Sequence, residues 1–312
     1  MSFKLTILGC NSAIPTTERK PTAQLLNVDE RFFLIDCGEG TQLQLRKYKI
    51  KMQSIQHIFI SHLHGDHYFG LIGLISTMHL LGREKELHVY GPPKLKDIIN
   101  IQLSASNTEL KYPLFFHTFG FDFPQVILQN ESIVVETIPL DHSIDCCGFL
   151  FREVEKPRRM RREKIQEYGI ANYLVPKIKE GGDFVLPDGT VIPHLELTRS
   201  AQKSRSFAFC SDTCFKPSIV DQIKNVDILY HEATFLQELK QRAQFTKHST
   251  AAQAATIAKK ANVGRLIIGH YSQRYFDLEP LLDEAKSIFD SSFLAIEGET
   301  HELKRSYNDI DS

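Results

Sequence analysis

The segment Ser61-His62-Leu63-His64-Gly65-Asp66-His67 places four possible metal-ligand side chains within six positions. Imidazole and carboxylate groups together suit zinc and neighbouring transition metals better than they suit calcium or magnesium. Only 13 of the 312 residues are histidine, so three within six positions would rarely occur by chance. The segment therefore predicts a metal site, and a polar turn with solvated histidines is the weaker interpretation.

The flanking residues indicate where this cluster lies. Ile55–Ile60 is apolar and β-branched, which predicts a buried strand. Tyr68–Leu81 is long enough for a helix, although Gly70 and Gly73 weaken that prediction. We therefore expect the cluster on a turn at the end of a strand, where side chains from one tight loop can converge on an ion.

The H-x-H-x-D-H spacing resembles the signature of the metallo-β-lactamase superfamily of dinuclear metal hydrolases. Four side chains on one loop cannot surround two metals, so further ligands must come from later strand ends. Strand-like segments at 134–140, 206–210 and 265–269 lead into His142, Asp212 and His270. Each such residue, taken alone, is more often a capping or turn residue; together, and in this order, they support the resemblance.

The resemblance implies a complete ligand set and a fold. His62, His64 and His142 would hold one metal, Asp66, His67 and His270 the other, and Asp212 would bridge the two. The cofactor would be two Zn²⁺ per chain, with other divalent metals possible. Such a pair holds a water whose pKa falls to about 7. The implied fold is α/β, a four-layer αββα sandwich.

The order of elements agrees with such a sandwich, because strands alternate with helices that can cover them. Strands are predicted at 3–9, 22–28, 31–36, 56–60, 87–90, 133–138, 147–152, 205–210, 227–230, 265–269, 293–296 and 300–304. Helices are predicted at 40–48, 69–81, 93–103, 217–222, 250–261 and 279–289.

The composition is typical of a soluble cytoplasmic enzyme. The chain is 42% hydrophobic with a net charge of −1, and its N-terminus lacks the pattern of a signal peptide. No apolar stretch reaches the roughly 18 residues of a membrane helix. The six cysteines are scattered and suggest no disulfide framework. Cys210 and Cys214 flank Asp212, and we expect buried thiols there rather than ligands.

The segment Arg152–Lys179 is strongly basic. It carries nine basic and four acidic residues, a difference of +5 in a chain of net charge −1. Such a run is usually a solvated face. Here it lies between two ligand-bearing strands, with Tyr168 and Tyr173 interleaved, and this favours an electrostatic contact with a phosphate backbone. We expect an insertion at 152–196 within a catalytic domain formed by 1–151 and 197–312.

Further segments narrow the resemblance to the ribonuclease Z family. They are Leu8–Thr16, Asp36–Gln42, the metal loop, His231-Glu232-Ala233-Thr234 and Lys247-His248-Ser249-Thr250, together with the basic insertion. The resemblance implies a zinc-dependent endoribonuclease that cleaves the 3′ trailer from precursor tRNA and leaves a 3′-hydroxyl on the tRNA. It also implies a homodimer, and a flexible arm that binds tRNA away from the cut.

The resemblance assigns roles to particular side chains. Asp66 would position and deprotonate the attacking water, while His248, oriented by Glu232, would protonate the leaving 3′-oxygen. Asp36 and Gly38-Glu39-Gly40 would support the site. The candidate substrate-binding residues are Arg158, Arg159, Arg161, Arg162, Lys177 and Lys179 in the arm, and Arg19 and Lys20 near the acceptor end.

Structural explanations compete with some of these roles, and two other functions stay open. Glu232 could form a strand-end salt bridge, and His248 could belong to an N-cap before the helix that follows Thr250. The chain could be another hydrolase of the superfamily, acting on a small thioester, lactam or phosphodiester, which would not need the basic arm. It could also be a non-catalytic RNA-binding module, which would be expected to have lost metal ligands.

Overall fold

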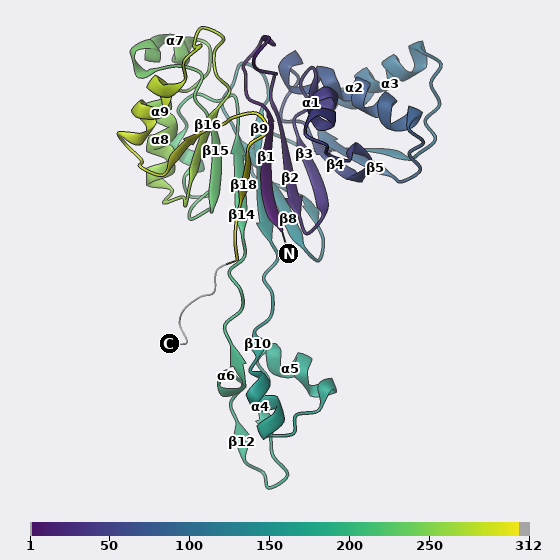
Figure 1. The fold of residues 1–312 in the computed structure, drawn as a ribbon, viewed down its shortest axis with the longest axis vertical. Coiled ribbons are helices and arrows are strands. Elements are labelled where there is room, and N and C mark those ends of the chain that lie inside the picture. The colour runs from purple at the N-terminus through teal and green to yellow at the C-terminus, as the bar shows by residue number, and fades with distance from the viewer. Residues whose placement is uncertain (1, 306–312) are drawn as a thin grey trace. The chain divides into compact units, whose positions relative to one another are not determined.

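The computed structural model describes residues 2–305, and these fall into two compact units (Figure 1). The first comprises residues 2–152 and 206–303, and the second comprises 153–205 with 304–305. The insertion expected at 152–196 thus corresponds to a unit that continues to Arg205. No helix in the described part of the chain is both long and apolar enough to cross a membrane.

Two seven-stranded sheets form the first unit. In spatial order, the first contains β18 (Thr300–Glu302), β1 (Phe3–Gly9), β2 (Ala23–Val28), β3 (Arg31–Ile35), β4 (Ile55–Phe59), β5 (Leu87–Gly91) and β6 (Leu114–Thr118). The second contains β17 (Ser292–Leu294), β16 (Leu266–Gly269), β15 (Ile228–Glu232), β14 (Ser206–Cys210), β9 (Cys147–Glu153), β8 (Ile133–Pro139) and β7 (Val126–Gln129).

Alternation along the strands divides the side chains of the first sheet between two cores. Phe3, Leu5 and Ile7 of β1 join a core shared with the second sheet, whereas Leu8 belongs to the core beneath the helices. Successive strand residues point to opposite faces, so one strand can supply both layers. The side chain of Phe59 on β4 likewise lies in the core shared with the second sheet, where its ring stacks on that of Tyr90 at a centroid distance of 4.6 Å.

Helices cover the outer face of each sheet (Figure 1). The helices α1 (Thr41–Lys47), α2 (Gly65–Leu80) and α3 (Lys94–Ala105) bury Leu45, Leu74 and Ile99 against the first sheet. The helices α8 (Ala251–Lys260) and α9 (Glu279–Lys286) pack Ala254 and Leu281 into the core of the second. The result is the predicted four-layer αββα sandwich.

Several elements differ from the predicted ones. The strands β6 and β7 and the helix α7 (Lys240–Phe245) were not predicted, and the helix expected at 217–222 is only a 3-10 turn at Pro217–Ile219. Both missed strands lie at sheet edges and bury none of their residues fully, so their sequences lack a clear apolar period. Helix α2 begins at Gly65, which places Asp66 and His67 in its first turn instead of on the expected loop.

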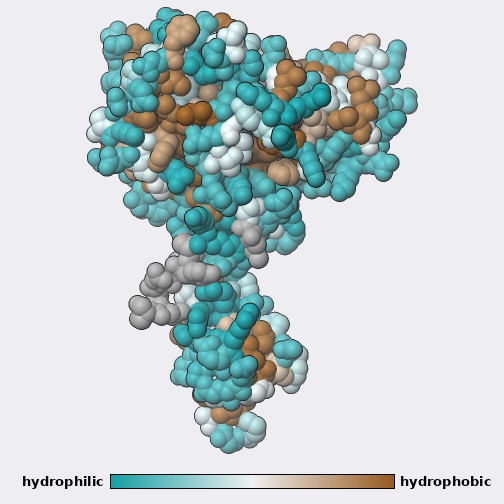
Figure 2. Space-filling model, viewed as in Figure 1, coloured by the Kyte–Doolittle hydropathy of each residue, from teal (hydrophilic) through white to brown (hydrophobic). Residues whose placement is uncertain are grey.

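The second unit has a small core of its own. It contains two two-stranded sheets, which pair β10 (Arg159–Met160) with β13 (Thr198–Arg199) and β11 (Phe184–Val185) with β12 (Val191–Ile192). Three short helices accompany them, α4 (Arg162–Glu167), α5 (Val175–Lys179) and α6 (His194–Leu197). Ile170, Ile178, Ile192 and Leu197 are buried together. Hydrophobic side chains also reach its surface beside α5 (Figure 2).

Candidate metal centre and active site

The seven predicted metal ligands converge at the ends of strands from both sheets. His62 and His64 follow β4, Asp66 and His67 begin α2, and His142 follows β8. Asp212 and His270 follow β14 and β16, which both pair in parallel with β15, so their carboxyl ends lie at one edge. Asp212 and His270 adopt left-handed backbone angles, with φ of 50° and 59°. Such angles are costly for residues other than glycine and are concentrated at functional sites.

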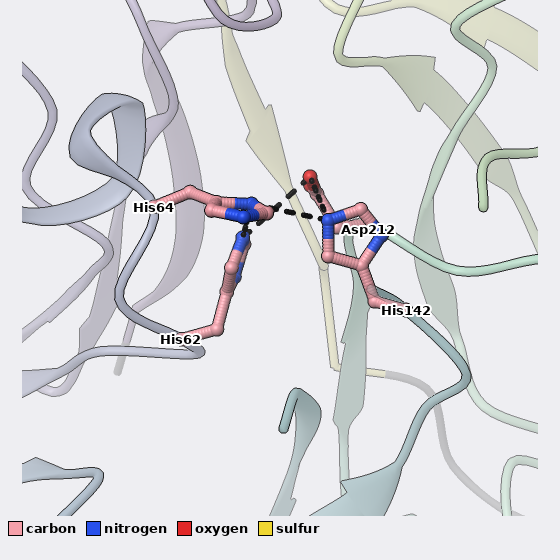
Figure 3. Close-up of side chains that lie close together, drawn as sticks. All are labelled: His62, His64, His142 and Asp212. Atoms are coloured by element: carbon pink, nitrogen blue, oxygen red, sulfur yellow. Dashed lines mark hydrogen bonds and ion pairs between the residues drawn. The ribbon is translucent and has the colours of Figure 1, made fainter. Parts of the chain in front are cut away.

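The first cluster consists of three imidazoles and one carboxylate (Figure 3). Nδ1 of His64 lies 3.1 Å from Nε2 of His62 and 3.1 Å from Nε2 of His142. Oδ2 of Asp212 lies 3.6 Å from Nε2 of His62 and 3.6 Å from Nε2 of His142. The four side chains point toward one another, so their ligand atoms surround one common position that can hold a metal ion.

The second cluster shares Asp212 with the first. Its other oxygen, Oδ1, lies 3.2 Å from Nε2 of His67 and 3.2 Å from Nε2 of His270. Oδ2 of Asp66 lies 3.4 Å from His67 Nε2 and 3.5 Å from His270 Nε2. Because each oxygen of Asp212 faces a different cluster, this one carboxylate can bridge two ions.

The spacing and the chemistry of these atoms fit zinc-type ions. Zn–N bonds of about 2.0–2.1 Å in tetrahedral geometry separate ligand atoms by about 3.3 Å, and the separations here are 3.1–3.6 Å. Nε2 of His67 and Nε2 of His270 are buried and face carboxylates without forming a hydrogen bond. A buried polar atom without such a bond is costly. The His and Asp clusters therefore form a candidate metal site.

A second layer of contacts fixes the histidine rings. Nδ1 of His67 lies 2.7 Å from Oδ2 of Asp36, and Nδ1 of His142 lies 2.9 Å from the Lys247 carbonyl oxygen. Nδ1 of His270 lies 3.1 Å from Oγ1 of Thr234. Such partners orient a ligand ring so that its other nitrogen faces the ion. The expected supporting role of Asp36 has this geometric basis, and the sequence did not single out the other two contacts.

The backbone near Asp66 is equally constrained. Oδ2 of Asp66 accepts a hydrogen bond of 2.7 Å from the amide of Ala13, whose own φ is 55°. A Cβ atom on Gly38 would lie 2.4 Å from the Asp66 carbonyl oxygen, so only glycine fits there. The segments Leu8–Thr16 and Asp36–Gln42 thus meet at the metal loop, a contact that their resemblance to the family did not specify.

Glu232 and His248 form a pair beside the clusters. Nδ1 of His248 lies 2.8 Å from Oε1 of Glu232, which ends β15 and is completely buried. Burial alone would lower the pKa of His248, but the negative charge of Glu232 and this hydrogen bond raise it to about 9. The imidazole is therefore charged at neutral pH. The cap of helix α8 is Thr250, not His248, and it forms a capping box with Gln253.

The charged groups of the centre influence one another strongly. Burial would raise the pKa of Asp212, but the surrounding histidines His270, His67 and His62 hold it well below the ordinary value. Burial also lowers the pKa of His62, with neighbouring histidines adding to the shift. An ionised carboxylate and a neutral imidazole are the forms that bind metal.

A cleft of about 500 Å³ opens onto the centre. Its lining includes Asp66, His142, Asp212, His248 and His270. Ligand atoms of Asp212, His248 and His270 also lie within 4.8 Å of one another, so His248 is close enough to compete as a ligand. Its 2.8 Å contact with Glu232 favours a proton-carrying role instead. Cys210 is buried as expected, whereas Cys214 is partly exposed, and neither joins a cluster among the described residues.

None of the predicted substrate-binding residues belongs to the His and Asp clusters found among the described residues. Arg19 donates to Asn11 Oδ1 at 3.0 Å and to the Tyr275 carbonyl at 2.7 Å, and Lys20 Nζ donates to the Thr16 carbonyl at 3.1 Å. Arg19 thus links its loop to the segment that carries Tyr275, and Lys20 makes a contact within the loop itself.

In the second unit, three of the predicted arginines have structural contacts. Arg158, Arg159 and Arg161 donate hydrogen bonds to Thr198 or Ser200. Arg162 and Lys177 are exposed, and Lys179 is half-buried. The exposed pair is thus the better candidate for contact with a ligand.

Comparison with known proteins identifies the family. Ribonuclease Z from Bacteroides thetaiotaomicron is 50% identical over 295 residues, covering 95% of this chain and 93% of that protein. The chain belongs to the ribonuclease Z family. Another member, from Bacteroides fragilis, is 48% identical over 95% of this chain and 97% of its own length. A family model described as anti-Pycsar protein Apyc1 matches residues 3–154.

Solved structures agree with this membership. The short form of human tRNase Z superposes with a TM-score of 0.70 at 27% identity, covering 96% of this chain and 98% of that one. The metallo-β-lactamase fold protein YhfI from Bacillus subtilis gives a TM-score of 0.67 at 19% identity, over 97% of this chain and 100% of that one, and shares the fold. The chain thus has a metallo-β-lactamase fold, as its sequence predicted.

Proposed function

We propose that the chain is a metal-dependent endoribonuclease that removes the 3′ trailer from precursor tRNA and leaves a 3′-hydroxyl on the tRNA. One observation carries the proposal: in a chain of the ribonuclease Z family, Asp212 lies between two histidine clusters, with the charged His248–Glu232 pair beside them. The clusters supply the means to activate water, and the pair supplies a proton.

The proposed cofactor is two Zn²⁺ ions, one held by His62, His64 and His142, the other by Asp66, His67 and His270, with Asp212 shared between them. When bound, two such ions supply a nucleophilic water near neutral pH and neutralise charge on the phosphodiester.

Side chains of the protein carry out the proton transfers of the proposed reaction. Asp66, fixed by the Ala13 amide, presents a carboxylate that can orient the attacking water and accept its proton. His248 lies in the wall of the cleft and carries a proton that the leaving 3′-oxygen requires. Glu232 keeps that proton on the ring and fixes its direction. Together they place a base and an acid at one phosphodiester.

The second unit is proposed to bind the tRNA. Arg162 and Lys177 are exposed there, and the Arg152–Lys179 segment has an excess of five positive charges, as counted above. Phosphate contacts of this kind release counterions, and each contact contributes about 0.9 to the slope of log affinity against log salt concentration for duplex nucleic acid.

Two finer expectations belong to the same proposal. A homodimer would be able to cover exposed apolar side chains such as Leu43 of α1 and Phe69 of α2, each 60% exposed, and the hydrophobic surface visible over the α1–α3 helices (Figure 2). Sedimentation at several protein concentrations tests it, and a monomer at all of them would contradict it. The cytoplasmic location stays a prediction that cell fractionation can test.

The test of function is cleavage of a precursor-tRNA transcript by purified protein, with and without a chelator. We expect a single cut that yields tRNA with a 3′-hydroxyl and a trailer with a 5′-phosphate, abolished by the chelator and restored by zinc. A protein that cleaves small thioesters or phosphodiesters efficiently but leaves precursor tRNA intact would overturn the proposal.

The role of the second unit has a separate test with a matched control. Arg162→Ala combined with Lys177→Ala should weaken precursor-tRNA binding and reduce the salt slope by up to about 2. The control pair, Lys94→Ala with Lys96→Ala, removes the same charge from exposed positions on α3. Equal effects of the two pairs would show that only net charge matters, and the second unit would then not be the binding element.

A further inference from the structure

Three histidines lie together on the first sheet, outside the catalytic cleft. Strand pairing aligns His57 of β4 with His88 of β5, and Tyr90 of β5 with His117 of β6. Residues two apart on a strand share a face, so the three rings lie on the same side of the sheet. The rings of His57 and His88 are 5.3 Å apart, and those of His88 and His117 are 5.2 Å apart.

Two of these rings present their nitrogens to each other. Nδ1 of His88 lies 2.9 Å from Nε2 of His117. The opposite nitrogen of His88, Nε2, lies 3.2 Å from a carboxylate oxygen of Glu86. A carboxylate that accepts a hydrogen bond from one ring nitrogen leaves the other with its lone pair free, which is the usual arrangement behind a metal-binding histidine.

We propose that His88 and His117 form a second metal-binding site, which takes a divalent transition-metal ion of the imidazole-preferring group: zinc, copper or nickel. Two nitrogens bound cis to such an ion lie about 2.8–3.4 Å apart, for metal–nitrogen bonds of about 2.0–2.1 Å. The observed 2.9 Å already falls in this range. Water would complete the coordination, because the side chain of His88 is 21% exposed.

The protonation of the neighbouring rings favours this binding. Burial, followed by the proximity of His88 and His117, lowers the pKa of His57 to about 4. Burial and His88 also lower the pKa of His117. Neutral imidazoles keep the lone pairs that a metal needs. The competing interpretation is a simple hydrogen bond between the rings of His88 and His117, and it predicts no metal uptake.

An ion bound at this site would stabilise the fold and would take no part in catalysis. Strand β6 is the last strand of its sheet and is bonded to β5 alone. An ion shared by His88 and His117 would tie this edge strand to its neighbour. Binding to the folded state alone raises its stability by mass action, so the melting temperature should rise with metal concentration.

The experiment uses protein that already carries its full complement of catalytic zinc. Nickel and copper are added to it separately; calorimetry measures binding, and electron paramagnetic resonance counts the nitrogens bound to copper. We expect one additional ion with two nitrogen ligands and a rise in melting temperature. His117→Gln, and independently His88→Gln, should weaken this ion by about tenfold or more, since even outer partners of metal ligands contribute about 10–100-fold.

His194→Gln is the matched control, because His194 is a partly exposed histidine with a carboxylate partner, Asp183, at 3.3 Å. It should bind the additional ion as the unaltered protein does. Melting without added metal shows that each variant is folded, and zinc analysis shows that copper or nickel has not replaced catalytic zinc. The proposal is overturned if the unaltered protein takes up no additional ion, or if either histidine variant keeps the same affinity and the same two-nitrogen signal.

Discussion

Replacing Glu232 by glutamine tests how the chain controls the proton on His248. The Glu232 carboxylate is completely buried and accepts hydrogen bonds from His248 Nδ1, Thr213 N, Thr234 Oγ1 and Ser249 N, at 2.7–3.0 Å. Glutamine keeps the size but loses the charge, and its amide nitrogen cannot accept. Each oxygen of Glu232 accepts two of these bonds, so two buried donors then lose their acceptor, and each loss costs about 1–3 kcal/mol of folding free energy.

The effect on His248 sets the size of the rate change. Burial opposes its charged form, and Glu232 is the main group that raises its pKa from 6.5 to about 9. Without that charge, burial leaves the pKa at or below the ordinary value. At about pH 7.5 the protonated fraction then falls from roughly 97% to below roughly 10%, so a step that needs this proton slows about tenfold or more.

The assay is single-turnover cleavage of precursor tRNA across about pH 6 to 10. The unaltered enzyme should keep its rate until the pH approaches about 9, and Glu232→Gln should lose it at least two pH units earlier, roughly as the pKa values differ. Bound metal shifts both curves in the same direction, so their separation is the quantity to measure.

Bis(p-nitrophenyl) phosphate is the control substrate, because its leaving group needs little protonation. With this substrate, the pH profiles of the unaltered enzyme and of Glu232→Gln should coincide. If Glu232→Gln, with normal metal content, lost its rate of tRNA cleavage at the same alkaline pH as the unaltered enzyme, the assignment of His248 as the acid would be wrong.

Three further outcomes follow from named contacts. Asp36→Asn removes the charge behind His67 and should lower metal affinity by about 10–100-fold in chelator competition; an unchanged affinity would contradict the orienting role. Burial opposes the charged form of His67, but Asp212, Asp66 and Asp36 raise its pKa well above the ordinary value, so metal must displace a proton. Apparent metal affinity should therefore fall as the pH is lowered, and calorimetry in two buffers should detect released protons; pH-independent binding would refute this. Thr250→Ala removes the capping box of α8 and should cost about 0.5–2 kcal/mol in denaturant unfolding; no loss would mean that the cap is replaced by water.

The residues of the candidate metal site could be singled out from the sequence, because most of them come shortly after an apolar strand. The strands before Asp212 and His270 both pair in parallel with β15 and end at the same edge. The strand before His142, β8, pairs antiparallel with β7, so the place of His142 beside the metal loop was predicted from the family resemblance. The family resemblance supplied what spacing could not, namely a proposal for which residues would share an ion. The bridging geometry of Asp212 needed the structure, because it depends on which oxygen faces which cluster.

Other features had no readable pattern. Strand β6 is an edge strand with half-exposed residues, so His117 gave no sign of lying beside His88. The charge pattern of the second unit predicted an insertion but not its small core or the contacts that occupy Arg158 and Arg161. These contacts join residues far apart in the sequence, which periodicity along a chain does not report.

Stepwise return of zinc to metal-free protein tests the central claim most directly, with precursor-tRNA cleavage and bound zinc measured on the same samples. We expect no cleavage without metal, full activity only near about two zinc ions per chain, and no recovery in Asp212→Ala at any zinc concentration. Cleavage by metal-free protein, or an Asp212→Ala enzyme as active as the unaltered one, would contradict a binuclear centre bridged by Asp212.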